Sequence, residues 1–259
     1  MITDCHSHID SRTGPANIEG HVSACENIDK CIVLAADGGS SETSNRKVSE
    51  YANERPNMVG FGVFNPLKDK PVARNIKSLT VDMGLEGVVL YCAEDGFHPA
   101  DSRAMRVYEV AEELELPVFF HNCDSLSSEA VVDFARPYLL DEIARKFNKL
   151  KIVIGGMGLP FLHETLCMAR KHKNVYADLT ISPDRKWKVY NTVITCYEAS
   201  VMDKLFFGSG YPDGNAGECV ETLLGFNMLL SDAGLPTVPR EEIRSVVERD
   251  TLSILGIDL

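Results

Sequence analysis

No apolar run in the 259-residue sequence is long enough to span a membrane. The strongest stretch, residues 152–162, is short and is broken by three glycines and a proline. Basic residues are also scarce, because 26 lysines and arginines face 38 aspartates and glutamates, for a net charge of −12. Such an acidic chain disfavours nucleic acid and anionic membranes as partners, so we expect neither. A small anionic substrate stays compatible with this charge.

The sequence also lacks cysteine pairs of the C-x-x-C type, although it contains eight cysteines. Asp4 and His6 interrupt any early apolar run, so the beginning of the chain does not resemble a secretory signal. We therefore expect reduced thiols, mostly packed in the interior of a cytoplasmic protein, with disulfide bonds as the alternative.

The remaining composition is that of a globular protein, with 44% hydrophobic and 25% charged residues. Short β-branched runs alternate with longer amphipathic stretches, which favours a parallel sheet with helical crossovers. Eight such runs predict an α/β fold with a single (β/α)8 TIM barrel, and no linker divides the chain, so we expect one domain over residues 1–259. The expected strands are residues 2–6, 30–35, 59–64, 87–91, 118–121, 151–154, 175–179 and 205–208.

Apolar residues at helical spacing lie between these runs. The connection after the first strand is poor in helix signal, and we expect a loop and a short helix there. The other expected helices are residues 42–55, 101–116, 128–149 with an interruption near Pro137, 161–173, 185–202, 217–233 and 241–255.

The first strand carries the most informative motif, Asp4-Cys5-His6-Ser7-His8. Side chains alternate along a strand, so Asp4, His6 and His8 are expected on one face. In barrels of this type the chemistry lies at the carboxyl ends of the strands, and His121 ends the fifth strand. Three imidazoles in this arrangement form a plausible Zn²⁺ site with an open position for water. The alternative is a chance His-x-His beside a core histidine.

Other polar residues carry weaker predictions. Asn65 and Tyr91 follow the third and fourth strands, and we consider them candidates for substrate binding. The glycines after the sixth strand resemble a phosphate-binding loop only weakly, because the full spacing is missing. We expect solvated side chains for the remaining histidines, which are His21, His98, His163 and His172.

The ordered series of strand ends resembles the amidohydrolase-related TIM-barrel family, which includes aminocarboxymuconate-semialdehyde decarboxylase and pyrone-dicarboxylate lactonase. The resemblance covers most of the chain and implies a barrel in which His6, His8 and His121 bind a divalent metal ion. The motifs that carry it are ITDCHSH at residues 2–8, GLEGVVL at 84–90, LPVFFH at 116–121, IGGMG at 154–158, NVYADL at 174–179 and FFGSGYP at 206–212.

The chain departs from the family pattern at two positions. The family's sixth strand normally ends in His-x-Gly, where this chain has Gly156, and its last strand normally reads Gly-Ser-Asp-Tyr-Pro, where this chain has Gly210. The family's acid–base pair is therefore missing. Asp178 and Asp213 are the nearest candidate catalytic carboxylates by topology, and the alternative is that each caps a turn.

Three functions remain open at this point. The first is a metal-dependent hydrolase acting on an ester, lactone or amide of a small carboxylated molecule, with one divalent metal, Zn²⁺ or Mn²⁺, and no organic cofactor. The second is a decarboxylase of an aromatic or muconate-type acid on the same scaffold. The third is a non-catalytic ligand-binding barrel, suggested by the two glycines. A homo-oligomer, most often a dimer among cytoplasmic enzymes, is compatible with all three.

Overall fold

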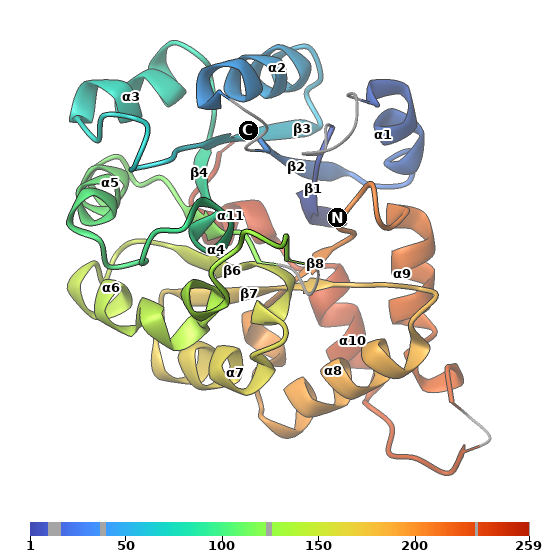
Figure 1. Cartoon of the computed structure of the whole chain (residues 1–259). Helices are drawn as coiled ribbons and strands as arrows, with labels where there is room; N and C mark the ends of the chain where they lie inside the picture. Colours follow the sequence, from blue (N-terminus) through green and yellow to red (C-terminus); the bar gives the residue numbers. More distant parts are fainter. Residues whose placement is uncertain (10–16, 37–39, 123–125, 231–232, 259) are drawn as a thin grey trace.

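The computed structural model describes residues 1–9, 17–36, 40–122, 126–230 and 233–258. Eight strands form one sheet in sequence order, and each is parallel to the next (Figure 1). Every expected strand is confirmed, with each boundary within one residue of the prediction. The strands are β1 (Thr3–Ser7), β2 (Lys30–Leu34), β3 (Met58–Val63), β4 (Gly87–Leu90), β5 (Val118–Phe120), β6 (Ile152–Ile154), β7 (Val175–Thr180) and β8 (Leu205–Gly208).

The first and last strands meet and bring the sheet close to a full barrel. Ser7 pairs with Tyr211 in a parallel bridge. The backbone N–H of His8 donates to the Tyr211 carbonyl at 3.0 Å, and that of Gly210 donates to the His6 carbonyl at 2.8 Å. The predicted (β/α)8 TIM barrel is therefore confirmed. This junction lies directly beside the His-x-His segment.

Helices surround the strands (Figure 1), and most lie where the sequence predicts them. The prediction omits two helices, α3 and the single turn of α4. The α3 helix buries only Ile76 and Leu79 and so has a weak apolar repeat. Pro137 begins a 3-10 helix and splits the expected 128–149 segment. The α-helices are α1 (Ile18–Ala24), α2 (Ser41–Asn53), α3 (Ala73–Val81), α4 (Cys92–Asp95), α5 (Ser102–Glu113), α6 (Asp141–Lys146), α7 (Leu162–Lys171), α8 (Lys186–Glu198), α9 (Ala216–Leu224), α10 (Arg240–Val247) and α11 (Thr251–Leu255). The 3-10 helices are η1 (Val132–Ala135), η2 (Pro137–Leu140), η3 (Gly155–Gly158), η4 (Met202–Lys204) and η5 (Phe226–Met228).

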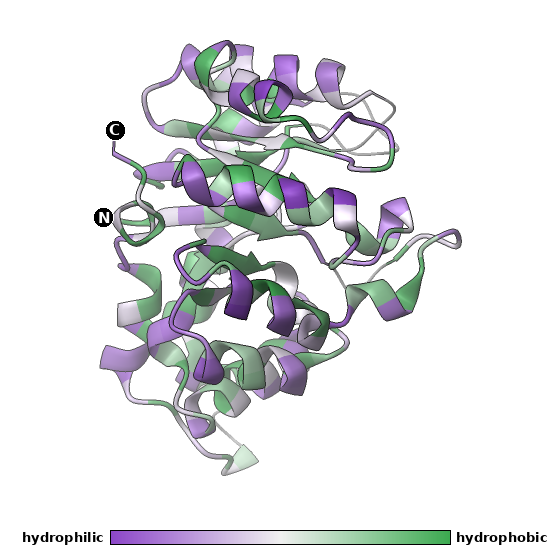
Figure 2. Ribbon diagram, turned by 90° about the vertical axis from the view of Figure 1, so that its left-hand side faces the viewer, coloured by the Kyte–Doolittle hydropathy of each residue, from purple (hydrophilic) through white to green (hydrophobic). Residues whose placement is uncertain are grey.

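The strands at the centre of the molecule are mostly hydrophobic, and the helices around them carry most of the hydrophilic residues, mixed with hydrophobic ones (Figure 2). Strands of a parallel sheet are buried on both faces and therefore read as nearly continuous apolar runs. Among the described residues no helix is long and apolar enough to cross a membrane. The seven described cysteines are free thiols, and only Cys167 is exposed; Cys123 lies outside the described residues.

Asp141 joins two helices of the outer layer. Its carboxylate accepts hydrogen bonds from Lys171, from His172 Nε2 at 2.7 Å and from Arg145 Nε at 3.0 Å. Hydrogen bonds from Lys171 and His172 hold the pKa of Asp141 well below its usual 3.8. The prediction that His172 is solvated is wrong, because its side chain is buried against this carboxylate.

We expect Asp141→Asn to lower the free energy of unfolding by about 1 kcal/mol at neutral pH, since the ion pairs are partly exposed. A carboxyl with a depressed folded pKa stabilises the protein above its unfolded pKa, and this contribution is lost as the pH falls through the folded value. Urea unfolding at neutral and acidic pH should therefore show a difference from wild type that shrinks on acidification. A difference independent of pH would contradict the ion-pair explanation. Glu109→Gln on an exposed face of α5 is the control.

Candidate metal centre

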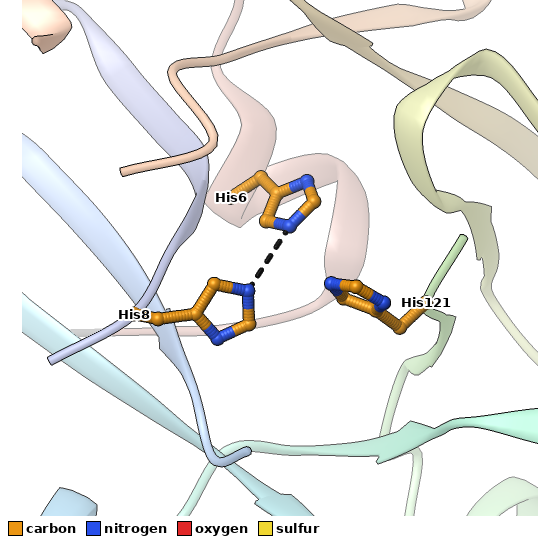
Figure 3. Close-up of side chains that lie close together, drawn as sticks. All are labelled: His6, His8 and His121. Atoms are coloured by element: carbon orange, nitrogen blue, oxygen red, sulfur yellow. Dashed lines mark hydrogen bonds between the residues drawn. The ribbon is translucent and has the colours of Figure 1, made fainter. Parts of the chain in front are cut away.

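Three histidines converge at the carboxyl ends of β1 and β5 (Figure 3). His6 lies on β1, His8 follows it directly, and His121 follows β5. Their rings lie 5.0–5.2 Å apart between centroids. One nitrogen from each ring lies within 4.8 Å of those of the other two. His6 is buried, whereas His8 and His121 are partly exposed, so the site is open on one side.

The outer nitrogens of the first two rings are anchored to acceptors. His6 Nδ1 lies 2.5 Å from Asp178 Oδ2, and His8 Nδ1 lies 3.0 Å from the Leu34 carbonyl oxygen. A carboxylate and a carbonyl accept hydrogen bonds, so each Nδ1 carries the proton of its neutral ring. Both Nε2 atoms then present lone pairs, and they lie 3.2 Å apart (Figure 3). Two lone pairs at this distance repel each other. A cation between them, either a proton or a metal ion, removes this repulsion.

The electrostatics place that proton on His6 when no metal is bound. Burial lowers the pKa of His6, but the charge and hydrogen bond of Asp178 outweigh burial, and the net pKa is raised above 6.5. Burial and the charge on His6 lower the pKa of His8 to about 3. His8 is therefore the acceptor, and His6 binds the shared proton more tightly than His8 does. A divalent cation would take the place of this shared proton, and the ligands suit it because imidazole nitrogen is a common ligand of Zn²⁺ and related ions.

Asp178 supports the site from within the barrel. It is fully buried on β7 and accepts hydrogen bonds from the Gly156 N–H at 2.9 Å and the Thr180 hydroxyl at 2.7 Å, as well as from His6. Burial raises the pKa of Asp178, but the charge of His6 and these hydrogen bonds bring it below 3.8. The alternative that Asp178 caps a turn is therefore wrong. Its carboxylate contacts Nδ1, on the opposite edge of the ring from Nε2, and so orients His6.

Asp4 does not share the face of His6, contrary to the strand-alternation prediction. The register of β1 shifts between Asp4 and Ser7. Adjacent residues Cys5 and His6 both reach Asp178, with Cys5 Sγ at 3.7 Å from Oδ1, which regular alternation forbids. The Asp4 carboxylate instead accepts from the backbone N–H of Ser209 at 2.9 Å and from its hydroxyl at 2.6 Å. Burial raises the pKa of Asp4 to about 6.

Both glycines at the departures from the family pattern adopt left-handed backbone conformations, with φ of +51° at Gly156 and +65° at Gly210. A Cβ atom at Gly210 would lie 2.7 Å from Thr180 Cγ2. A side chain at either position would be strained, so the backbone has adapted to glycine. Asp213, three residues later, is exposed and donates its N–H to the Gly210 carbonyl at 3.0 Å. Its charge still contributes to the raised pKa of His6.

Asn65 and Tyr91 are both buried near the same end of the barrel. The Tyr91 hydroxyl donates to the Ala35 carbonyl at 3.1 Å, and its ring lies 4.5 Å from that of His121 between centroids. Tyr91 therefore packs against a candidate ligand. Asn65 Oδ1 accepts from the Leu67 N–H at 2.9 Å, while its Nδ2 has no acceptor within the described part of the chain. Their assignment to substrate binding stays a prediction.

His21 is a polar residue that the sequence analysis misplaced. It is fully buried on α1, with Nε2 2.9 Å from the Ser7 hydroxyl and Nδ1 2.7 Å from the Tyr51 hydroxyl. The prediction of a solvated side chain is wrong here, because α1 packs this face against the barrel. The segment carried too little helical pattern to indicate which face is buried. His98 and His163 are exposed, as expected.

The fold is a parallel eight-stranded barrel, and the three histidines at its strand ends form a ligand set that could hold a divalent metal ion. The sequence model of the amidohydrolase family matches residues 35–232. The chain therefore belongs to the amidohydrolase family. The match begins after His6 and His8, so these two candidate ligands rest on the structure and the motif. A search of curated protein sequences finds no match.

Solved structures with the same fold include enzymes of different reactions. A probable 2-pyrone-4,6-dicarboxylic acid hydrolase from Acinetobacter baumannii, with citric acid bound, has a TM-score of 0.68 at 14% identity, covering 99% of each chain. A 5-carboxyvanillate decarboxylase from Novosphingobium aromaticivorans, complexed with manganese and a nitrobenzoic acid, has a TM-score of 0.69 at 13% identity, covering 99% of this chain and 96% of that one. A putative amidohydrolase from Staphylococcus aureus has a TM-score of 0.71 at 15% identity, covering 99% of each chain. At these identities the likeness establishes the fold.

Proposed function

We propose that the chain is a metal-dependent hydrolase that acts on an ester, lactone or amide of a small carboxylated molecule. The observation that carries the proposal is the 3.2 Å distance between His6 Nε2 and His8 Nε2, with His121 beside them. Nδ1 of His6 and Nδ1 of His8 each donate to an acceptor, as the free ring nitrogen of a metal-binding histidine usually does. The similarity to a 2-pyrone-4,6-dicarboxylic acid hydrolase supports a carboxylated substrate.

A divalent metal ion at this site would supply Lewis-acid polarisation of a carbonyl and activation of water. The chain itself holds the ligands in place: Asp178 keeps the proton of His6 on Nδ1, and the Leu34 carbonyl does the same for His8. Tyr91 packs against His121. Zn²⁺ and Mn²⁺ both accept imidazole, and the manganese in the decarboxylase complex supports Mn²⁺ as well as Zn²⁺.

Proton transfer in this proposal falls to Asp213. Gly156 and Gly210 offer no side chain, and the Asp178 carboxylate is directed at His6. Asp213 is exposed, and its charge reaches His6. We assign it the role of general base toward water at the open side of the site. Asn65 Nδ2, a donor with no acceptor in the described ranges, supports the assignment of this residue to substrate binding.

Decarboxylation is the second candidate, because a manganese-bound 5-carboxyvanillate decarboxylase matches the fold as well as the hydrolase does. We rank it below hydrolysis because decarboxylation must deliver a proton to carbon, and Gly156 stands where the family has a histidine for this step. A ligand-binding barrel without turnover is the third candidate.

Metal-free protein loaded with Zn²⁺ or Mn²⁺ should be assayed on carboxylated lactones and esters and on hydroxylated aromatic acids. We expect acid release from a lactone or ester, dependent on metal and lost in His121→Ala. Carbon dioxide release from an aromatic acid would instead establish decarboxylation. Thermal stabilisation by these ligands without turnover would establish a binding protein. Circular dichroism of His121→Ala checks that the variant is folded.

A further inference from the structure

A second cluster of metal-ligating groups lies behind β1, on the side away from His6. The Asp4 carboxylate, the Cys25 sulfur and the Cys31 sulfur lie within 4.8 Å of one another. All three side chains are buried, and their exposed fractions are 0%, 2% and 0%. They come from β1, from the residue that ends α1, and from β2. Free thiols are often buried for packing alone, but a fully buried carboxylate such as that of Asp4 is rare.

The backbone fixes the position of each of these groups. Cys31 pairs directly with Asp4 in the β1–β2 ladder, and its N–H donates to the Asn57 carbonyl at 2.9 Å. The N–H of Cys25 donates to the His21 carbonyl at 3.1 Å at the end of α1. The three groups are therefore held together by secondary structure before any ligand binds. Preorganisation of this kind lowers the free-energy cost of binding a metal.

His21 supplies a proton donor beside the sulfur of Cys25. The Ser7 hydroxyl donates its single proton to the Ile32 carbonyl at 2.9 Å. His21 Nε2, 2.9 Å from the same hydroxyl oxygen, must therefore be its donor and carry a proton. The Nε2 atom lies 3.8 Å from Cys25 Sγ, so the ring edge that carries this proton is close to the sulfur while the proton itself is directed at Ser7. A hydrogen bond from Cys31 and the neighbouring His21 lower the pKa of the Cys25 thiol, whereas the same hydrogen bond and burial raise the pKa of the Cys31 thiol.

We propose that Asp4, Cys25 and Cys31 bind one closed-shell thiophilic metal ion, such as Zn²⁺ or Cu⁺, at a structural site distinct from the three histidines. Two sulfurs on a tetrahedral Zn²⁺ lie about 3.8 Å apart, given bonds of about 2.3 Å, which the cluster accommodates. Asp4 accepts hydrogen bonds from Ser209 and His6, and a carboxylate has a further lone pair for a metal. Binding releases the thiol protons to solvent. The bound ion would link the end of α1 and β2 to β1, the strand that carries His6.

The test separates this site from the histidine site by removing the latter. His6→Ala/His8→Ala protein should be unfolded with chelator and reductant, refolded with Cd²⁺ as the probe, and freed of unbound metal. We expect about one Cd²⁺ per chain and the ultraviolet absorption of thiolate–Cd²⁺ bonds. The unmodified chain refolded in the same way is expected to hold about two Cd²⁺ ions, one of them with the same absorption.

Adding Cys31→Ser should abolish the thiolate absorption, and Cys25→Ser should do the same. Cys196→Ser is the matched control, since Cys196 is an equally buried thiol on α8 that belongs to no such cluster among the described residues. The absorption in chains with all cysteines intact shows that thiols bind Cd²⁺, and its loss in a folded variant assigns it to Cys25 and Cys31. Where a serine variant does not fold, Cys25→Ala or Cys31→Ala takes its place. Folded protein that binds Cd²⁺ without thiolate absorption would overturn the proposal. A Cys25–Cys31 disulfide that, once reduced, takes up no Cd²⁺ would do so too.

Discussion

His8→Ala is expected to remove the ability of the histidine site to retain a divalent metal ion, weakening metal affinity at that site by more than the roughly 10–100-fold cost of losing a supporting residue. The variant deletes one of the two lone pairs that face each other at 3.2 Å. Without the His8 ring, His6 Nε2 no longer faces a second lone pair, so the chain loses the repulsion between the two nitrogens that a bound cation would relieve. Metal content by elemental analysis after gel filtration, together with affinity measured against a competing chelator, checks the expectation.

His163→Ala is the matched control for this experiment, because His163 is exposed on α7 and belongs to no ligand cluster in the described part of the chain. We expect it to keep the metal affinity of the unmodified chain. Full metal retention by His8→Ala would mean that the retained ion is bound elsewhere. In that case the cluster of Asp4, Cys25 and Cys31 is the first place to look, and thiolate absorption would identify it.

The fold was predictable because parallel barrel strands are buried on both faces. Segments such as Val118–Phe120 and Leu205–Gly208 consist almost entirely of apolar residues, as expected for parallel strands covered by helices, and eight such units favour a closed barrel over an open sheet. The convergence of His6, His8 and His121 followed from the same topology, since all three come at carboxyl ends of barrel strands. Spacing along the chain was sufficient for this part of the site.

The second layer of the site was not predictable in the same way. The shift in β1 register turns Asp4 away from His6, and strand alternation gives no indication of such an irregularity. Asp178 was selected by topology alone, and its partner on β1 lies 172 residues away in sequence. His21 lies on a helix of only seven residues, too short to show an apolar repeat. Each failure concerns a contact between distant segments or a local irregularity.

Asp178→Asn is expected to weaken metal affinity about 10–100-fold while preserving the fold. The asparagine has the size of the aspartate and can still accept from the Gly156 N–H, so packing is retained. It removes the negative charge that holds the proton of His6 on Nδ1 and raises the pKa of that ring. Asp178→Ala should in addition lower the free energy of unfolding by about 1–3 kcal/mol, because it leaves buried hydrogen-bond donors unsatisfied. Chelator competition and urea unfolding measure the two effects separately.

Asp213→Asn completes the comparison, because the two aspartates are assigned different roles. Asp213 is exposed, so its replacement should leave metal affinity and stability nearly unchanged. If Asp213 is the general base, turnover should fall by about 10²–10⁴-fold. Asp178→Asn, in contrast, should recover most of its turnover at saturating metal, since its effect passes through His6. Equal losses in both variants at saturating metal would contradict this division and would place Asp178 in direct contact with the reacting groups.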